Sequence, residues 1–397
     1  MPLIETTVSC PVRRSFRVAQ IVGMFDVPIE TKAAQTFALE IPALDEDWKL
    51  GLIVGPSGSG KTTLARAAFG DAYDSPAPWP TDAAVIDGFG ELPIKTITHA
   101  LTAVGLGSPP AWLRPYHTLS NGERFRCDLA RALVNAKGQG DEGAKGQRDE
   151  QKGEAKKSMP KMPSPSPLGP FVSSPLPLVV FDEFTSVVDR TVAQTASAAI
   201  AKAIRSGRFA ARLVAVTCHD DVAAWLAPDW IVDVGAGTLS RRLLRRPELR
   251  LQVARCRRTV WRLFARHHYL ARGLSRGAAC YVALWNERPI AFCAIAAQLG
   301  RRGWKRSSRI VTLPDFQGLG IGARLAETVA RHEQSRGFQV SITASHPAIV
   351  AGFARSAKRK CVGTRSAGQA SRQRIDGREI PTALGRSVVT FDFAEEV

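Results

Sequence analysis

The feature that most constrains the fold is the run GPSGSGKT at Gly55–Thr62, which follows the apolar stretch KLGLIV at Lys49–Val54. The run matches the pattern GxxxxGK[ST], in which glycines let backbone N–H groups turn inward around phosphate groups. Lys61 reaches the β- and γ-phosphates in this pattern, and the Thr62 hydroxyl binds Mg²⁺. With helix-forming residues following at Leu64–Phe69, the pattern predicts an α/β unit that binds a nucleoside triphosphate.

Three later segments carry chemistry in an order that suits such a site. LSNGE at Leu119–Glu123 has the S-x-x-E spacing of a capping box and predicts a helix start. In the run VVFDEF, Asp182 at a strand end suits a Mg²⁺ ligand, and Glu183 can polarise an attacking water. His219 follows the apolar run at Leu213–Thr217. Taken singly, His219 is more often a structural histidine and the two acids a solvated strand end. Their common order favours a catalytic role.

Together these residues resemble the ATP-binding cassette (ABC) ATPases over about residues 15–240, apart from an insert. The resemblance implies Glu183 and His219 as catalytic residues, with Asp182 at the metal. It implies a homodimer through the ATPase domain, in which Ser120 and Gly122 of one chain contact the ATP held by the other. The residues it assigns to ATP are Gly55, Pro56, Ser57, Gly58, Ser59, Gly60, Lys61, Thr62, Thr63, Ser120 and Gly122, with Thr62 and Asp182 as Mg²⁺ ligands.

Two family features are missing or unplaced. The stretch AVIDGFGELP has no glutamine where the family carries its Q-loop, so Asp87 or Glu91 is a candidate substitute. For the aromatic residue that stacks on adenine, the candidates are Phe25 and Phe37, each of which is equally suited to a core. Asp189 matches the family's D-loop.

An insert interrupts this unit at residues 135–177. Mixed charges in its first part give way to Pro and Ser, with almost no apolar periodicity. Such a segment cannot bury enough surface to offset the entropy of ordering it. We therefore predict a disordered insert within the N-terminal domain, which spans residues 1–240.

The positive charge of the chain is confined to its last part. Residues 241–397 hold 30 Lys+Arg and 10 Asp+Glu, whereas the first 240 residues have a net charge of −2. Of those 30 basic residues, 27 are Arg. Such asymmetry predicts a module that meets a polyanion, with nucleic acid as the first candidate partner. An ordinary Arg-rich surface is the alternative.

A second glycine-rich loop lies in this basic part. The strand-like run SRIVTL leads to QGLGIG at Gln317–Gly322 and then to the helix-like run ARLAETVARHE. Consecutive N–H groups at a helix N-terminus favour a phosphate or pyrophosphate. Before the loop, Tyr281–Ala297 predicts a hairpin that turns at Asn286–Glu287. After it come the strand FQVSITAS, the helix PAIVAGFARSA and the strand RSVVTFDF.

This arrangement resembles the GNAT acetyltransferases over about Arg250–Val397. The resemblance implies an α+β fold and direct transfer of an acyl group from acetyl-CoA, or another acyl-CoA, to an amine. The later helix carries Phe353 where many members have a Tyr that protonates the leaving thiolate, so Ser345, His346, Ser356 or solvent would take that role. His267 and His268 are candidate bases. The loop residues implied to bind acyl-CoA are Gln317, Gly318, Leu319, Gly320, Ile321 and Gly322.

We therefore predict an ABC-type α/β ATPase domain (residues 1–240) followed by an α+β GNAT-like domain (residues 241–397). The pairing itself resembles a fusion family of these two modules. The predicted function is ATP-coupled N-acyl transfer on or near nucleic acid, using ATP, Mg²⁺ and acetyl-CoA. The alternatives are an ATP-switched nucleic-acid-binding protein with a noncatalytic GNAT fold, and an acetyltransferase for small molecules or proteins. Seven cysteines without a CxxC pair and no apolar run of ~18–20 residues predict a cytoplasmic protein that does not bind membranes.

Overall fold

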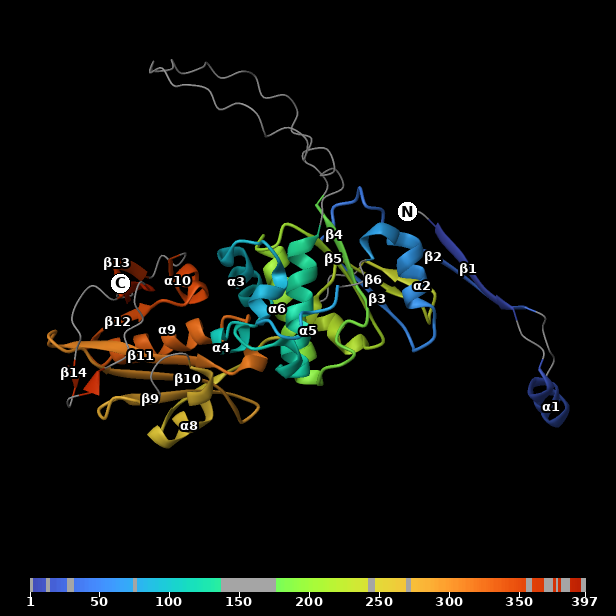
Figure 1. Ribbon diagram of the computed structural model, residues 1–397. Coiled ribbons are helices and arrows are strands. Elements are labelled where there is room, and N and C mark those ends of the chain that lie inside the picture. The colour runs from blue at the N-terminus through green and yellow to red at the C-terminus, as the bar shows by residue number, and fades with distance from the viewer. Residues whose placement is uncertain are drawn as a thin grey trace, which may run out of the picture.

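The computed structural model contains two large β-sheets, and each packs against its own helices (Figure 1). We call residues 3–241 the N-terminal domain and residues 247–393 the C-terminal domain. The structure describes residues 3–11, 15–26, 32–73, 77–136, 176–241, 247–268, 273–354, 359–367, 374–375, 378–379 and 386–393. Most of the predicted disordered insert, residues 137–175, lies outside these ranges. Within them, no helix combines the length and apolar character needed to cross a membrane.

The N-terminal domain is built on a five-stranded sheet of order β4-β5-β3-β6-β7. Strands β3, β4, β5 and β6 are parallel, and β7 pairs antiparallel with β6. The apolar runs at residues 50–54, 179–181 and 213–217 lie in strands β3, β4 and β5. Their bounds are β3 (Leu50–Val54), β4 (Leu178–Phe181), β5 (Arg212–Thr217), β6 (Trp230–Asp233) and β7 (Thr238–Ser240).

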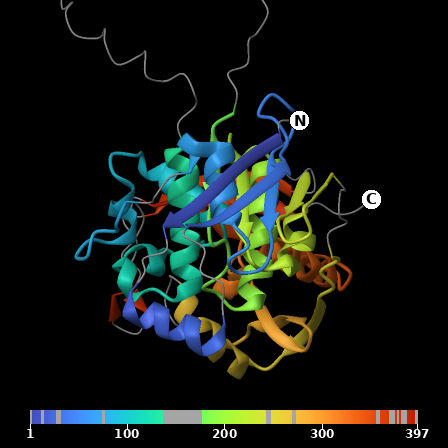
Figure 2. The same cartoon turned by 90° about the vertical axis from the view of Figure 1, so that its right-hand side faces the viewer.

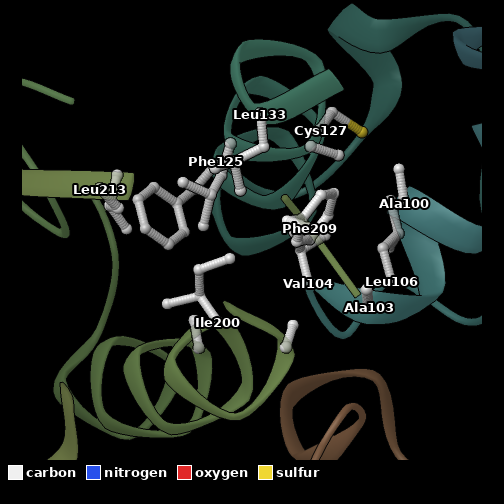
Figure 3. Close-up of a cluster of buried hydrophobic side chains, with 14 of the residues drawn as sticks. Ala100, Ala103, Val104, Leu106, Phe125, Cys127, Leu133, Ile200, Phe209 and Leu213 are labelled. Carbon is white, nitrogen blue, oxygen red and sulfur yellow. The ribbon is translucent and has the colours of Figure 1, made fainter. Parts of the chain in front are cut away.

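Helices cover both faces of this sheet because its central strands are apolar on both sides. Leu52 of β3 joins a core with α3, α5 and α6, whereas Ile53 joins a second core with α2 on the opposite face. Figure 3 shows the first core where Val104, Phe125 and Ile200 meet. The helices are α2 (Lys61–Phe69), α3 (Ile94–Ala103), α4 (Pro109–Trp112), α5 (Asn121–Asn135), α6 (Arg190–Arg205) and α7 (Ala223–Leu226).

Strands β1 (Leu3–Pro11) and β2 (Lys32–Glu40) form an antiparallel pair on the outer side of this domain. Figure 2 views the molecule from that side. Helix α1 (Phe16–Phe25) connects the two strands and stands apart from the sheet (Figure 1). None of its residues is buried. Phe25, a candidate for stacking on adenine, is exposed on this helix.

The C-terminal domain has a seven-stranded sheet of order β13-β16-β12-β11-β10-β9-β8. Only β11 and β12 are parallel among these neighbours, and their pairing ends at Ser307 with Ile342. Beyond that point β11 continues to Thr312 paired only with β10, so β11 and β12 separate. The strands are β8 (Gln252–Cys256), β9 (Ala279–Trp285), β10 (Arg288–Ala297), β11 (Trp304–Thr312), β12 (Gln339–Ala344), β13 (Arg359–Ala367) and β16 (Arg386–Phe393), with a separate short pair β14 (Arg374–Ile375) and β15 (Arg378–Glu379).

Helices lie on both faces of this sheet as well. Helices α9 (Ile321–Gln334) and α10 (Pro347–Ala354) pack on one face, and α8 (Trp261–Phe264) packs on the other. The predicted hairpin is confirmed, because Asn286 and Glu287 have φ of 47° and 65° at its turn. Two consecutive positive φ values are those of a type I′ turn. No local sequence pattern predicts β8 or β13.

A buried carboxylate joins α9 to this sheet. Glu333 is fully buried, and it accepts hydrogen bonds from Tyr281 Oη at 2.8 Å and from Lys305 Nζ at 2.5 Å. Burial by itself raises the pKa of Glu333, but the hydrogen bonds from Lys305 and Tyr281 lower it overall. The ionised form therefore stabilises the folded domain.

We expect Glu333→Ala to lower the free energy of unfolding by about 3–5 kcal/mol at pH 7, because Lys305 loses its buried partner. The ionised carboxylate stabilises the fold above its ordinary pKa of 4.5, and this contribution is lost as pH falls through the lower pKa of the folded state. The difference between the proteins should therefore shrink below pH 4.5. Denaturant titration of the full chain measures both effects. Glu248→Ala, which removes a carboxylate that is 73% exposed, should change stability by less than about 0.5 kcal/mol.

Candidate functional site

The first glycine-rich loop joins the end of β3 to the start of α2. Gly60 precedes the helix with φ of 86°, and Gly58 has φ of 78°, a region that favours glycine. The loop residues are half-buried or exposed at the carboxyl edge of the sheet. Lys61 Nζ donates to the Pro56 carbonyl at 2.7 Å, which holds its charge over the loop. Helix α2 thus presents its N-terminal amides together with a cation, as a phosphate site requires.

The carboxylate of Asp182, which directly follows β4, lies beside this loop. Thr62 Oγ1 donates to Asp182 Oδ2 at 2.9 Å, although the two residues are 120 positions apart. A hydroxyl and a carboxylate oxygen are the ligand types that Mg²⁺ prefers, so these two side chains fit such an ion. Tyr73 also donates a hydrogen bond to Asp182. Burial and the Asp182 carboxylate raise the pKa of Tyr73, so its hydroxyl stays a donor.

The backbone after Asp182 adopts uncommon torsion angles. Glu183 has φ of 50° and Thr185 has φ of 67°, and a β-branched residue rarely takes such a value. Strain of this kind persists where the surrounding structure holds it, and it clusters at functional sites. It leaves the Glu183 side chain exposed at the sheet edge. The Phe184 amide bonds the Val216 carbonyl at 2.8 Å, which fixes this turn against the end of β5.

The strand order brings a third group to the same edge. Strand β5 lies between β3 and β4, and His219 follows its carboxyl end. The His219 amide donates to Thr217 Oγ1 at 3.1 Å. Ligands of parallel sheets bind at the carboxyl ends of the strands. The first glycine-rich loop, Asp182 with Glu183, and His219 therefore share one edge.

The LSNGE segment begins α5 with the predicted capping box. Ser120 Oγ accepts from the Glu123 amide at 3.3 Å, and the Glu123 carboxylate accepts from the Ser120 amide at 2.9 Å. A Cβ at Gly122 would come 3.0 Å from Val192 of α6, so glycine allows the two helices to approach closely here. Ser120 is exposed. Asp87 and Glu91, the candidate substitutes for the missing glutamine, are exposed too.

The second glycine-rich loop joins β11 to α9, at the point where β11 has separated from β12. Gly318 and Gly320 have φ of 84° and 88°, and Gly320 precedes the helix without a side-chain cap. Helix α9 has no acidic residue in its first turn. Its first amides and its positive dipole end are therefore available to an anion.

This second loop also forms the contact between the two domains. Asp315, just before the loop, has its carbonyl oxygen bonded by Thr195 Oγ1 at 2.6 Å and by Arg126 at 3.2 Å. Gln317 Oε1 accepts from the Gly107 amide at 2.7 Å, while Gln317 Nε2 donates to the carbonyl at the end of β11 at 3.0 Å. Arg126 is fully buried on α5, the helix that begins at the LSNGE segment. The loop therefore touches the N-terminal domain directly.

The candidate histidines have separate positions. His346 Nε2 donates to the Gly107 carbonyl at 2.8 Å, so it belongs to the domain contact, and burial lowers its pKa. His267 follows α8 on the opposite face of the sheet. Burial, assisted by Arg266, lowers the pKa of His267, which favours the neutral, proton-accepting ring. Phe353 is fully buried in the core, as expected for a residue without an acid–base role. Ser356 lies outside the described residues.

Four further residues contact the second loop or Asp182, although no sequence motif predicts them: Tyr73, Arg126, Thr195 and Lys202. Tyr73 contacts Asp182, whereas Arg126, Thr195 and Lys202 contact the second loop. None of them falls within a recognisable motif. Their partners are more than 100 positions away in sequence, so no local pattern identifies them.

Comparison with known proteins assigns the second loop. The family model described as an acetyltransferase (GNAT) domain matches residues 276–355, which include the loop and α9. Residues 276–355 form a GNAT domain. A search of the curated proteins found no match to the chain. The match covers β9 to α10 and leaves the N-terminal domain unassigned.

Solved structures similar to the chain include several acetyltransferases. The IAA acetyltransferase from Bacillus cereus ATCC 14579 is 12% identical, with a TM-score of 0.27, over 36% of this chain and 99% of its own. The ribosomal-protein-S18-alanine N-acetyltransferase from Escherichia coli is 15% identical, with a TM-score of 0.28, over 37% and 97%. A GNAT family acetyltransferase from Elizabethkingia anophelis with acetyl-CoA bound is 11% identical, with a TM-score of 0.26, over 36% and 98%. These values are too low to assign a substrate to the GNAT domain.

Proposed function

We propose that this protein is an acyl-CoA-dependent N-acyltransferase whose GNAT domain is coupled to an ABC-type ATPase in the same chain. The observation that carries the proposal is the position of the second glycine-rich loop and the residues just before it. Residues 315–319 bind α5 and α6 of the N-terminal domain, and these helices follow the LSNGE segment and Asp189. A change of nucleotide state that moved α5 or α6 would reach the acyl-CoA loop through direct contacts.

In the proposed transfer, the amides of Gln317–Gly322 bind the CoA pyrophosphate, and the edge of β11 that no longer pairs with β12 holds the thioester carbonyl. The acceptor amine attacks this carbonyl carbon, a C–N bond forms, and the C–S bond breaks to release CoA thiolate. The amine loses one proton and the thiolate gains one. His267 is the candidate acceptor of the first proton, because burial lowers its pKa and so favours the neutral ring. Its Nε2 accepts a hydrogen bond from Arg266 Nε at 3.1 Å, which that proton would displace.

In the proposed ATPase, Lys61 and the loop amides bind the phosphates. Magnesium would be held by Thr62 and Asp182 and would neutralise charge between the phosphates. Glu183 polarises a water that attacks the γ-phosphorus, giving ADP and phosphate. We further propose a homodimer, in which the exposed Ser120 and the half-buried Gly122 of the second copy complete the site.

For the acceptor we propose nucleic acid, because the surface of the C-terminal domain around β8 and α8 is basic. Residues 249–286 contain eight Arg and no Asp or Glu. Among them, Arg255, Arg257 and Arg262 are exposed on β8 and around α8, the side of the sheet that carries His267. Guanidinium groups pair bidentately with phosphate. A nucleic acid on this surface would lie opposite the face that carries the acyl-CoA loop and α9.

The decisive test is to incubate the full chain with ATP, acetyl-CoA labelled in its acetyl group, and separate fractions of nucleic acid, protein and small amines. Label transferred to nucleic acid supports the proposal. Label only in protein or small amines favours an acetyltransferase for proteins or small molecules. Binding to nucleic acid without transfer of label favours a noncatalytic GNAT fold. Lys61→Ala tests whether transfer requires ATP binding.

Binding to duplex DNA should weaken steeply with salt, by roughly 0.9 in log affinity per unit of log salt for each phosphate contact. We expect the triple change of Arg255, Arg257 and Arg262 to Ser to reduce this slope by about 2.7, since each contact contributes separately. Fluorescence anisotropy of the full chain between low and moderate salt measures the slope. Arg17→Ser on α1 is the control and should leave it unchanged. A triple variant with the wild-type slope would contradict this surface.

A further inference from the structure

The segment between α3 and α4 of the N-terminal domain is bonded to both sides of the place where β11 and β12 part. The Gly107 amide donates to Gln317 Oε1 at 2.7 Å, on the side that follows β11. The Gly107 carbonyl accepts from His346 Nε2 at 2.8 Å, on the side that follows β12. One residue of the N-terminal domain therefore joins the two chain segments that leave the separated strands.

Close packing leaves no free space at this contact. A Cβ at Gly107 would come 3.2 Å from Gln317 Oε1. A Cβ at Gly318 would come 2.7 Å from Ala199 Cβ, closer than real Cβ atoms come, and 3.0 Å from Gly105 Cα. The second glycine-rich loop therefore lies directly against α6 and the segment between α3 and α4.

The N-terminal domain holds this segment in its own core. Leu106 is fully buried, and its carbonyl accepts from Trp112 Nε1 at 2.7 Å. The Leu106 amide donates to the Leu101 carbonyl of α3 at 2.8 Å. Helix α3 in turn contacts α10 of the C-terminal domain (Figure 1). The segment would therefore leave the C-terminal domain together with its helices, because it is not a free loop.

One buried cation makes the domain contact costly. Arg126 of α5 is fully buried and donates to the Asp315 carbonyl at 3.2 Å. Its Nε has no hydrogen-bond partner among the residues that the structure describes. A buried charged group with unpaired donors costs free energy. Separation of the domains would expose Arg126 to water and relieve that cost.

We propose that the N-terminal domain closes the acyl-CoA site, and that acyl-CoA binds when the segment between α3 and α4 withdraws from Gln317 and His346. The inference rests on the proposed acyl-CoA function and adds its regulation. A ligand with its pyrophosphate at the second loop and its thioester on the edge of β11 lies between the segments that follow β11 and β12. Gly107 bonds across that position, so ligand and contact exclude each other. Acyl-CoA binding and domain separation are therefore linked.

Hydrogen–deuterium exchange of the full chain, with and without saturating acetyl-CoA, tests the closure directly. We expect acetyl-CoA to speed exchange of the Gly107 amide by about 10-fold, because its bond to Gln317 is released. The amides of the second loop should exchange more slowly. The Ile53 amide, in the centre of β3, is the reference and should not change. A ligand that merely touched Gly107 would slow its exchange.

Thr195→Val weakens the contact from outside the acyl-CoA site, because it removes the hydroxyl bonded to the Asp315 carbonyl at 2.6 Å. The open fraction rises, so calorimetry should show acetyl-CoA bound about 5-fold more tightly. Gly107→Val, which does not fit against Gln317, should tighten binding by about 10-fold. Thr98→Val is the matched control and should keep wild-type affinity, since its hydroxyl bonds carbonyls of its own helix.

The remaining outcomes separate the closure from the proposed function. Unchanged or slower exchange at Gly107 with acetyl-CoA bound overturns the closure and leaves the proposed transferase in place. Weaker binding by Thr195→Val and Gly107→Val, at the wild-type melting temperature, also overturns it. Binding by both variants but not by wild type supports a fully closed resting form. No binding of acetyl-CoA by any of these proteins contradicts the proposed function itself.

Discussion

Glu183→Gln should reduce ATP turnover by about 100- to 10,000-fold, because the attacking water loses the carboxylate that polarises it. ATP binding should persist, since the phosphate loop and the pair of Thr62 and Asp182 are unchanged. Phosphate release measures turnover, and equilibrium binding of ATP measures the occupancy of the site. Glu5→Gln on β1 is a matched control with an exposed side chain, and it should keep wild-type turnover.

The same variant tests the proposed dimer. If Ser120 and Gly122 of a second copy contact the bound ATP, a variant that retains ATP should remain dimeric. Size-exclusion chromatography with saturating ATP should then show a dimer for Glu183→Gln and a monomer without nucleotide. A monomer under both conditions would rule out the shared site, and wild-type turnover in the variant would remove Glu183 from catalysis.

Gly320→Glu should weaken acetyl-CoA binding by at least about 100-fold, because its side chain fills the space in front of the α9 amides. Its carboxylate also lies beside Lys202, where the pyrophosphate is proposed to bind. The substitution adds backbone strain, because Gly320 has φ of 88°. Calorimetry with acetyl-CoA measures the loss of affinity, and thermal unfolding measures the strain.

Gly337→Glu separates the two effects. Gly337 has φ of 84°, follows the far end of α9, and has open space around the place of a Cβ. This variant carries the same charge and a similar backbone strain, away from the loop. It should lose stability as Gly320→Glu does but keep wild-type affinity. Equal loss of affinity in both variants would place the CoA site elsewhere.

Local sequence patterns predicted the segments whose geometry depends on near neighbours. The capping box at Ser120 and Glu123 formed because both partners lie within one helical turn. The hairpin turn at Asn286 and Glu287 formed because these two positions tolerate positive φ between apolar strands. The phosphate loop at Gly55–Thr62 is local in the same sense. Each needs only a few consecutive residues.

Patterns failed where the decisive contacts are distant. Phe25 was equally suited to stacking on adenine or to a core, and only the structure shows that it is exposed on α1. His346 was a candidate acid, but its Nε2 donates a hydrogen bond to the Gly107 carbonyl across the domain contact. The sequences of β8 and β13 mix polar and apolar residues, so they did not predict these two edge strands. Sequence spacing carries no record of these partners.

The sequence by itself determined the two glycine-rich loops, the helix that follows each, and the charge contrast between the two parts of the chain. These depend on backbone torsion preferences, helix capping and composition, which act over a few residues. Only the tertiary structure decided that α5 and α6 hold the segment from Asp315 to Leu319. That contact joins residues more than 100 positions apart through close packing at Gly105 and Gly318. Its register comes from the fit of two folded surfaces, which no local pattern encodes.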